Sequence, residues 1–211
     1  MPEGPSIIIA KEELDQFTRK KIFDASGSAG FDMDRLTGKK ITRITTWGKH
    51  LLFCFDGFYL RIHFLMFGKY FIDGHKALKP RLALKFAGKR ELNFYTSAIK
   101  LHEGDPDDDY DWSADIMNKK WSMAGAKKKL KAIPNTFIAD ALMDQEIFSG
   151  VGNIIKNEIL YRVKIHPGSL TGGIPARKIT ALCKAARDYA FEFLEQRKAG
   201  TLSKNWQVYT R

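Results

Sequence analysis

Short apolar segments separated by glycine-containing turns fill the first half of the chain. Apolar and polar residues alternate within seven of them, at residues 20–28, 39–48, 49–57, 58–64, 69–74, 81–88 and 90–97. Regular short strands with such turns predict an antiparallel β-sandwich or barrel. The Asp56-Gly57 pair predicts a hairpin between the third and fourth segments. Ahead of the strands, Pro5 suits the first turn of a helix, because its missing N–H costs nothing there.

The second half of the chain changes to a helical period. Residues 124–133, 135–148, 152–163 and 176–198 have the spacing of helices. The turn SGVGN, at residues 149–153, lies between the second and third of them. We expect Asn153 to cap the third helix and the two glycines to let the backbone approach another group closely. Free N–H groups at a helix start bind phosphate, although about half of such glycine turns are plain connections.

Positive charge is concentrated in the helical half. The 211-residue chain has a formal net charge of +11, which indicates an anionic partner. Residues 119–211 contain 17 Lys and Arg against 7 Asp and Glu, a balance of +10, whereas residues 1–118 contain 18 against 17, a balance of +1. The change follows an acidic segment at 102–112, which we interpret as the connection between domains at 1–111 and 112–211. The helical half is the expected anchor on nucleic acid, although the KKKLK run at 127–131 is by itself more typical of a solvated surface.

Composition also excludes several classes of protein. No apolar run reaches the length of a membrane helix, and no signal-peptide pattern precedes the fold, so we expect a cytoplasmic protein without a membrane partner. Cys54 and Cys183 stand far apart in apolar surroundings and match no metal spacing. We expect both to be buried free thiols.

The first residues of the chain raise a chemical question. Pro2 is small enough for Met1 to be removed, which leaves a secondary amine beside the carboxylate of Glu3. The pair is either an ordinary lead-in to a helix or a nucleophile with a proton-transfer partner. An α-amino group with a pKa of about 8 is partly a free amine at neutral pH. The positive end of a following helix disfavours the protonated form further.

Three stretches of sequence belong together: MPEGP at the N-terminus, WGKHLL in the predicted sheet, and LMDQEIFSGVGNIIKNEILYRVKIHP in the helical half. In this order they resemble the formamidopyrimidine-DNA glycosylase and endonuclease VIII family of base-excision repair enzymes. The third stretch is similar to that family's helix-two-turn-helix DNA-binding motif. The resemblance implies an α+β fold, in which an N-terminal antiparallel β-sandwich introduced by a helix precedes an all-helical helix-two-turn-helix domain.

The resemblance implies a catalytic set of Pro2, Glu3 and Lys49. The amine of Pro2 would attack C1′ of a damaged nucleoside, and the resulting iminium would permit elimination of the 3′- and then the 5′-phosphate. Glu3 would donate the proton that opens the sugar ring, for which burial must raise its pKa. Lys49 would contact phosphate beside the lesion. The alternatives are a Glu3 that merely favours a helix N-terminus and a Lys49 kept at a strand edge for solubility.

The resemblance also assigns contacts with DNA to residues in both halves of the chain: Leu65, Met66, Phe67, Gly150, Gly152 and Asn153. The last three would bind backbone phosphate. The first three would fill the gap that a flipped-out nucleotide leaves, unless they form a stripe of the sandwich core. Glu158 would lie near the catalytic amine, the alternative being a surface position.

Three features depart from the family pattern. Ser6 stands where family members commonly have a glutamate. The segment YTSAIKLHEG lacks the arginine–phenylalanine pair of the oxidised-purine branch, and so is closer to the endonuclease VIII branch, whose usual targets are oxidised pyrimidines. NWQVYTR is similar to the approach to the family's C-terminal zinc finger, but no CxxC pair occurs. We therefore expect no metal site and no cofactor in this chain, and a zinc finger after Arg211 in a longer protein.

Together these features predict a bifunctional DNA glycosylase and abasic-site lyase. We expect a monomer that acts on damaged double-stranded DNA in the nucleoid. One alternative is a non-catalytic protein on the same scaffold that binds damaged or structured DNA, which Ser6 and the missing finger favour. Another is a general RNA or DNA binder that uses the basic helical domain and does not prefer damage.

Overall fold

The computed structural model describes residues 2–209, which form two compact units. One unit contains Pro2 and residues 10–110, and the other contains Glu3–Ile9 and residues 111–209. We expected the whole N-terminal segment in the first domain. Glu3–Ile9 instead belong with the helices, where the N–H of Gly4 donates to the carbonyl of Gly150 at 2.9 Å.

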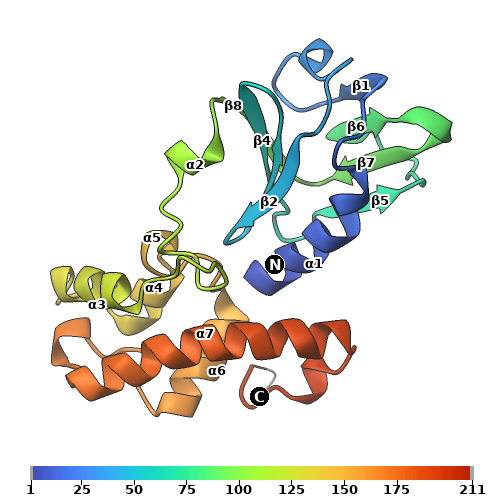
Figure 1. The fold of residues 1–211 in the computed structure, drawn as a ribbon. Helices are drawn as coiled ribbons and strands as arrows, with labels where there is room; N and C mark the ends of the chain where they lie inside the picture. The colour runs from blue at the N-terminus through green and yellow to red at the C-terminus, as the bar shows by residue number, and fades with distance from the viewer. Residues whose placement is uncertain (1, 210–211) are drawn as a thin grey trace. The chain divides into compact units, whose positions relative to one another are not determined.

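The first unit is built on two four-stranded antiparallel sheets (Figure 1). The first sheet has the order β1 (Asp24–Gly27), β6 (Leu82–Lys85), β7 (Glu91–Tyr95) and β5 (Lys69–Ile72). The second has the order β2 (Arg43–Trp47), β3 (His50–Cys54), β4 (Phe58–His63) and β8 (Ala98–Glu103). All seven predicted segments contain a strand, and β8 is the one that the pattern missed. The chain turns between β7 and β8 within two residues, and the positive φ of 51° there is adopted by Thr96, so no glycine marks the turn.

Aromatic side chains pack between the two sheets. Phe53 on β3 and Phe94 on β7 are both fully buried, and their rings meet edge to face with centroids 5.9 Å apart. Phe64, which directly follows β4, also packs on Phe94 at 6.1 Å. Edge-to-face aromatic pairs stabilise a core beyond their area burial, by about 1 kcal/mol each. The sandwich that the alternating pattern predicted is therefore confirmed.

The second unit is helical. It comprises the first residues of α1 (Gly4–Leu14) and five later helices, α3 (Met123–Ala132), α4 (Ile138–Met143), α5 (Gln145–Phe148), α6 (Asn153–Val163) and α7 (Ala176–Lys198). Helices α6 and α7 pack together through fully buried side chains, among them Ile155 and Ile159 of α6 and Leu182 and Ala186 of α7. In Figure 1, α7 is the long orange-red helix. Short 3₁₀ helices occur at η1 (Asp15–Phe17), η2 (Met33–Arg35), η3 (Ala87–Lys89), η4 (Thr171–Gly173) and η5 (Leu202–Lys204).

The structure has two helices, α4 and α5, where the sequence predicted a single one. The expected helix at 135–148 is interrupted at Asp144, which adopts an extended conformation with φ −70° and ψ 113°. Its carboxylate accepts the N–H of Glu146 at 2.9 Å and so caps the start of α5. A cap of this kind competes with a continuous helix because Asp bonds neighbouring backbone donors. The apolar spacing runs through the break and conceals it.

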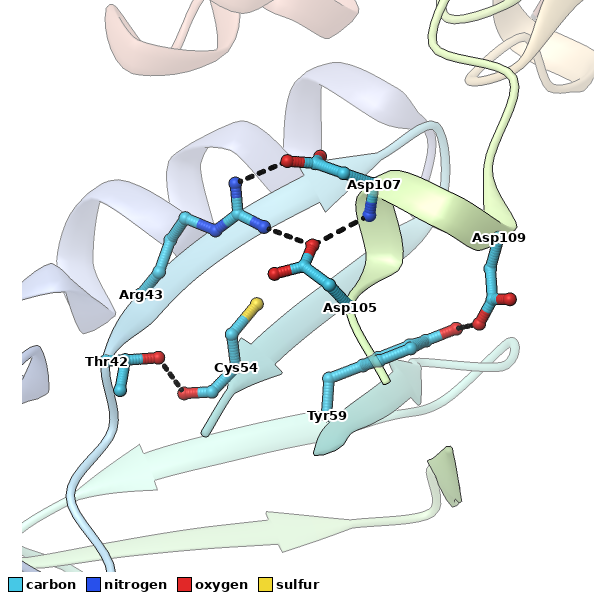
Figure 2. A network of polar contacts seen from close by, with 7 residues as sticks. All are labelled: Thr42, Arg43, Cys54, Tyr59, Asp105, Asp107 and Asp109. Atoms are coloured by element: carbon cyan, nitrogen blue, oxygen red, sulfur yellow. Dashed lines mark hydrogen bonds and ion pairs between the residues drawn. The ribbon is translucent and has the colours of Figure 1, made fainter. Parts of the chain in front are cut away.

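The acidic segment before Tyr110 is folded onto the second sheet (Figure 2). It contains α2 (Pro106–Asp109), which Asp105 caps by accepting a backbone N–H two residues further on at 2.8 Å. Arg43 of β2 donates to Asp105 at 2.9 Å, and the hydroxyl of Tyr59 on β4 donates to Asp109 at 2.6 Å. The carboxylates of Asp105 and Asp109 are thus engaged within their own unit.

Within residues 2–209, no helix combines the length and the apolar character that a membrane crossing requires.

Candidate active site

The carboxylate of Glu3 lies at the N-terminus of α6. Its Oε1 accepts the N–H of Ile154 at 2.7 Å, and its Oε2 accepts those of Gly152 at 3.2 Å and Ile155 at 3.1 Å. Only 3% of Glu3 is exposed. A helix start carries partial positive charge and unpaired N–H groups, so this is a strong site for an anion. The donors stabilise the ionised form of the carboxylate.

The expected role of Glu3 as a proton donor stays a prediction. Burial and the three N–H donors act in opposite directions on a carboxylate, because burial disfavours the charged form and the donors favour it. The alternative was that Glu3 supports a helix N-terminus. Its carboxylate does so for α6, and not for α1, which follows Glu3 in sequence. The next residue, Gly4, donates its N–H to the carbonyl of Gly150. The chain that follows half-buried Pro2 is therefore fixed at two residues, Glu3 and Gly4.

Gly152 makes room for this carboxylate. A Cβ at position 152 would lie 2.5 Å from Cδ of Glu3, a distance that real Cβ atoms do not show. Its φ of −126° is available to any residue, so the requirement is for space and not for backbone freedom. The expectation that the glycines permit a close approach is confirmed, but the approaching group is the N-terminal segment of this same chain.

The amides of the turn at 149–152 already have partners. Gly150 donates its N–H to Oε1 of Gln145 at 3.1 Å, and Val151 donates to the carbonyl of Phe148 at 3.1 Å. Gly152 donates to the carboxylate described above. Phosphate binding by the N–H groups of Gly150 and Gly152 stays a prediction, and it would require them to exchange these partners.

Asn153 is exposed and is the first residue of α6 rather than its cap. Gly152 occupies the cap position and contributes no side-chain bond. The Oδ1 of Asn153 instead accepts from Nζ of Lys156 at 2.9 Å, one turn along the helix. The two side chains form an exposed polar pair at a helix start, a position from which a phosphate can be bound.

Lys49 is at the tip of the hairpin that joins β2 to β3. Trp47 pairs with His50, so Gly48 and Lys49 form a two-residue loop. A positive φ of 52° at Gly48 alone fits a type II′ turn, which requires glycine at its first position. Only 7% of Lys49 is exposed, so the alternative of a lysine kept at the surface for solubility is wrong. Burial is the main cause that lowers the pKa of His63, and the positive charge of Lys49 is the second cause.

His50 is held neutral beside Lys49. Burial lowers its pKa to about 3, and the charge of Arg61 adds to this effect. The Nδ1 of His50 lies 3.3 Å from the hydroxyl of Tyr110, and its ring packs on Trp47 with centroids 5.6 Å apart. The hairpin that carries Lys49 is therefore supported by aromatic side chains with no charge at neutral pH.

We expect the free energy of unfolding to fall as the pH is lowered from about 6.5 towards 3. The unfolded chain binds a proton at His50 with its ordinary pKa of 6.5, whereas the folded chain does not until about 3, so the unfolded state is favoured in between. His50 contributes at most about 1.4 kcal/mol per pH unit to this slope. Urea unfolding of the wild type and His50→Gln across this range measures it. Equal slopes in the two proteins would contradict the assignment.

Leu65, Met66 and Phe67 lie in the turn between β4 and β5. Their exposed fractions are 42%, 65% and 72%, whereas the preceding Phe64 is buried at 4%. The expected turn is confirmed, and the alternative of a stripe in the sandwich core is wrong. Three consecutive exposed apolar side chains are unusual on a protein surface and point to a contact with a partner.

Glu158 is fully buried on α6, so the alternative of a surface position is wrong. Its carboxylate accepts N–H groups from the C-terminal segment: Gln207 at 2.9 Å, Val208 at 2.9 Å and Tyr209 at 3.0 Å. The structure thus gives Glu158 a role in holding this segment. No sequence motif marks a carboxylate whose partners are backbone amides.

Tyr189 on α7 is a candidate that sequence reasoning missed. Its side chain is 1% exposed, and its hydroxyl has no hydrogen-bond partner among the described residues. Burial raises its pKa, and the charges of Glu158 and Glu3 contribute. The two buried carboxylates therefore lie within electrostatic range of one phenol.

The described residues include no group of three or more His, Cys, Asp or Glu side chains placed to hold a metal ion. Cys54 and Cys183 are buried free thiols, as predicted. Burial raises the pKa of Cys183 to about 11 and also raises that of Cys54, so both are kept protonated.

Comparisons with known proteins match both units. The N-terminal domain of formamidopyrimidine-DNA glycosylase matches residues 1–97, and the H2TH domain of the same enzyme matches residues 113–204. Endonuclease 8-like 3 of Mus musculus is 31% identical over 218 residues, which cover 99% of this chain and 36% of that protein. Formamidopyrimidine-DNA glycosylase of Lactobacillus helveticus is 30% identical over 166 residues, which cover 71% of this chain and 58% of that protein.

A solved structure has the same fold. It is the crystal structure of Lactococcus lactis formamidopyrimidine-DNA glycosylase, non-covalently bound to DNA that contains an abasic site. It matches with a TM-score of 0.87 at 25% identity, over 99% of this chain and 87% of that one. The predicted α+β class, with a sandwich followed by a helix-two-turn-helix region, is confirmed. The chain spans about a third of the length of the Endonuclease 8-like 3 proteins that it matches.

Proposed function

Because the chain belongs to the formamidopyrimidine-DNA glycosylase and endonuclease VIII family, we propose that it is a bifunctional DNA glycosylase and abasic-site lyase. The observation that carries the proposal is the carboxylate of Glu3, which directly follows Pro2 and is held by three backbone N–H groups at the start of α6. A group that must transfer protons during a reaction has to be fixed in position. The DNA-bound relative from Lactococcus lactis supports DNA as the partner.

Pro2 is the proposed nucleophile, once Met1 has been removed. Its amine nitrogen attacks C1′ of the damaged nucleotide, and the bond between C1′ and the base breaks. The departing base takes up a proton. The nucleotide has to leave the helical stack for this attack, because C1′ is not accessible within an intact duplex.

Glu3 then moves one proton. Attack leaves the proline nitrogen protonated, and the charged carboxylate of Glu3 can accept that proton. Glu3 delivers it to the ring oxygen O4′, so that the bond between C1′ and O4′ breaks and a C1′–nitrogen double bond forms. The N–H donors hold the carboxylate in a fixed position directly after Pro2, from which it can begin this sequence.

The iminium supports strand cleavage. A secondary amine gives an iminium that cannot lose a proton from nitrogen, so it remains an electron sink. It acidifies the hydrogen at C2′, whose loss expels the 3′-phosphate, and a second elimination expels the 5′-phosphate. The amine is the nucleophile and the carboxylate moves the proton of ring opening, while water donates the proton to the departing base and accepts the protons lost in the eliminations. The proposed reaction therefore needs no cofactor.

Lys49 and the exposed apolar turn serve the substrate in this proposal. A buried ammonium at the rigid tip of a hairpin can hold a phosphate next to the reacting sugar. Leu65, Met66 and Phe67 are exposed on a turn and can fill the space of the flipped nucleotide. The +10 balance of residues 119–211 supplies non-specific attraction to the backbone.

We expect the chain with a free Pro2 amine to nick a duplex that carries one oxidised pyrimidine, and to nick an abasic duplex, while leaving an undamaged duplex intact. Gel electrophoresis resolves the products, which should end in phosphate on both sides of the gap. A parallel duplex with one oxidised purine reports the preferred class of lesion. Damage-selective binding without nicking would favour the non-catalytic alternative.

Two variants separate chemistry from anchoring in the same assay. Lys49→Ala should lower the single-turnover rate at saturating enzyme by about 10²-fold, because it removes a charge beside the reaction. Asn153→Ala should weaken binding to damaged and undamaged duplexes by a similar factor, because phosphate contacts carry no lesion information. A Lys49→Ala protein that lost affinity alone would make Lys49 a backbone clamp instead.

A further inference from the structure

A groove of about 630 Å³ lies between α3, η4 and the start of α7. Leu130 and Ile179, both buried, and half-buried Ile174 form an apolar floor, and exposed Ala124 and Ala176 flank it. A concave apolar site of this size falls within the range in which proteins bind ligands. Gly152, Ile154 and Ile155, whose N–H groups hold Glu3, do not line it, and neither do Pro2, Glu3 or Lys49, so the proposed glycosylase activity does not explain it.

Lysine side chains surround this floor. Lys127, Lys128 and Lys131 line the groove, no acidic residue lines it, and none of the three forms an ion pair within the described part of the chain. Lys129 belongs to the same KKKLK run but donates to Asp111 at 2.7 Å and does not line the groove. Because successive residues of a helix point in different directions, Lys129 pairs with Asp111, whereas the other three lysines line the groove.

The walls of the groove are fixed by hydrogen bonds. Nζ of Lys127 donates to the hydroxyl of Thr180, which joins α3 to α7 at 2.9 Å. The N–H groups of Thr171 and Gly172 in η4 donate to the carbonyls of Thr136 and Pro134, each at 2.9 Å. A groove held in this way is preformed, so a ligand does not have to order it on binding.

We propose that this groove binds a peptide segment of a partner protein that carries acidic side chains beside apolar ones. Apolar side chains would fill the floor, where burial supplies affinity, and carboxylates would meet Lys128 and Lys131 at the rim. An amphipathic segment is the form in which a peptide presents both features on one face.

The lining favours a peptide over nucleic acid. A phosphate backbone would satisfy the lysines but would gain nothing from Leu130, Ile174 and Ile179. Bases bind single-stranded sites by stacking on aromatic rings, and no aromatic side chain lines the groove. An apolar floor, combined with lysines that form no ion pair within residues 2–209, therefore fits an acidic, amphipathic peptide.

The test uses the full chain and a fluorescein-labelled synthetic peptide with leucines at helical spacing, flanked by Asp and Glu. Anisotropy measures its affinity for the wild type, for the double variant Lys128→Glu, Lys131→Glu, and for the control Lys119→Glu, Lys120→Glu. The control makes the same change of net charge at exposed lysines outside the groove. A second peptide with serine in place of leucine has the same charge without the apolar anchors.

We expect the groove variant to lose at least about tenfold in peptide affinity and the control variant less than about threefold. The serine peptide should bind at least about tenfold more weakly than the leucine peptide to the wild type. Equal losses in both variants, or equal binding of both peptides, would overturn the proposal. It would also be overturned if the groove variant lost affinity for undamaged duplex and not for the peptide, because the lysines would then contact DNA.

Discussion

A chain that retains Met1 is expected to lose both base removal and strand cleavage while it still binds a damaged duplex. Retention of Met1 places the nitrogen of Pro2 in an amide, whose lone pair is delocalised and which cannot attack C1′. Loss of a covalent nucleophile typically costs about 10³-fold or more in rate. Single-turnover nicking of an abasic duplex measures the effect.

The matched control is the same preparation after an aminopeptidase has exposed Pro2, as verified by intact mass. Activity should return with the free amine. Rates that agree within about threefold before and after treatment would remove Pro2 from the mechanism, since the difference would lie below 1 kcal/mol. Binding to the duplex should be the same in both preparations, because the lysines and Asn153 are unchanged.

The second large effect is expected for Glu3→Gln. It should abolish removal of an intact damaged base, by about 10²–10⁴-fold, because the amide can neither accept the proton of the proline nitrogen nor deliver it to O4′. Cleavage at a preformed abasic site should largely survive, since its sugar opens without the enzyme. The two rates are measured on duplexes that differ only at the lesion. Equal loss of both activities would make Glu3 a structural residue.

Gly152→Ala is an independent way to impair the function of the Glu3 carboxylate. The added Cβ would clash with the carboxylate of Glu3 at 2.5 Å, and the flexible end of that side chain is what can move away. The variant should therefore reproduce the selective loss of base removal. Gly173→Ala is the control, because a Cβ there meets no atom within 4 Å. If both glycine variants kept full activity, the position of the Glu3 carboxylate would not matter.

Local patterns predicted most of the fold. Alternation and glycine turns located seven of eight strands because each is a local property of a few residues. They missed β8 because Thr96 makes the preceding turn without glycine. They merged α4 and α5 because the extended backbone at Asp144 leaves the apolar spacing undisturbed.

The sequence named candidate residues for the site but could not predict the environment of each. Motif matching named Pro2, Glu3 and Lys49, but the contact between Glu3 and Ile154 joins residues 151 positions apart, and no local pattern encodes it. The same holds for Glu158, which binds the backbone 49 to 51 positions further along the chain. The partner of the Gly152 N–H could not be predicted for the same reason, because it is a carboxylate from a distant part of the chain.

The burial of Lys49 and the exposure of the turn at 65–67 could not be predicted from the sequence. A lysine after glycine in a hairpin is usually exposed, whereas only 7% of this one is exposed. Leu65 and Phe67 alternate as core residues would, and only the turn at 65–67 places them outside the sandwich.

Sodium borohydride trapping tests the central claim most directly. The iminium between enzyme and sugar is reduced by borohydride to a stable amine, which fixes the protein to an abasic duplex. Peptide mapping of the product should place the cross-link at Pro2. A cross-link at Lys49, or no cross-link in a chain whose Pro2 amine is free, would contradict the proposed mechanism.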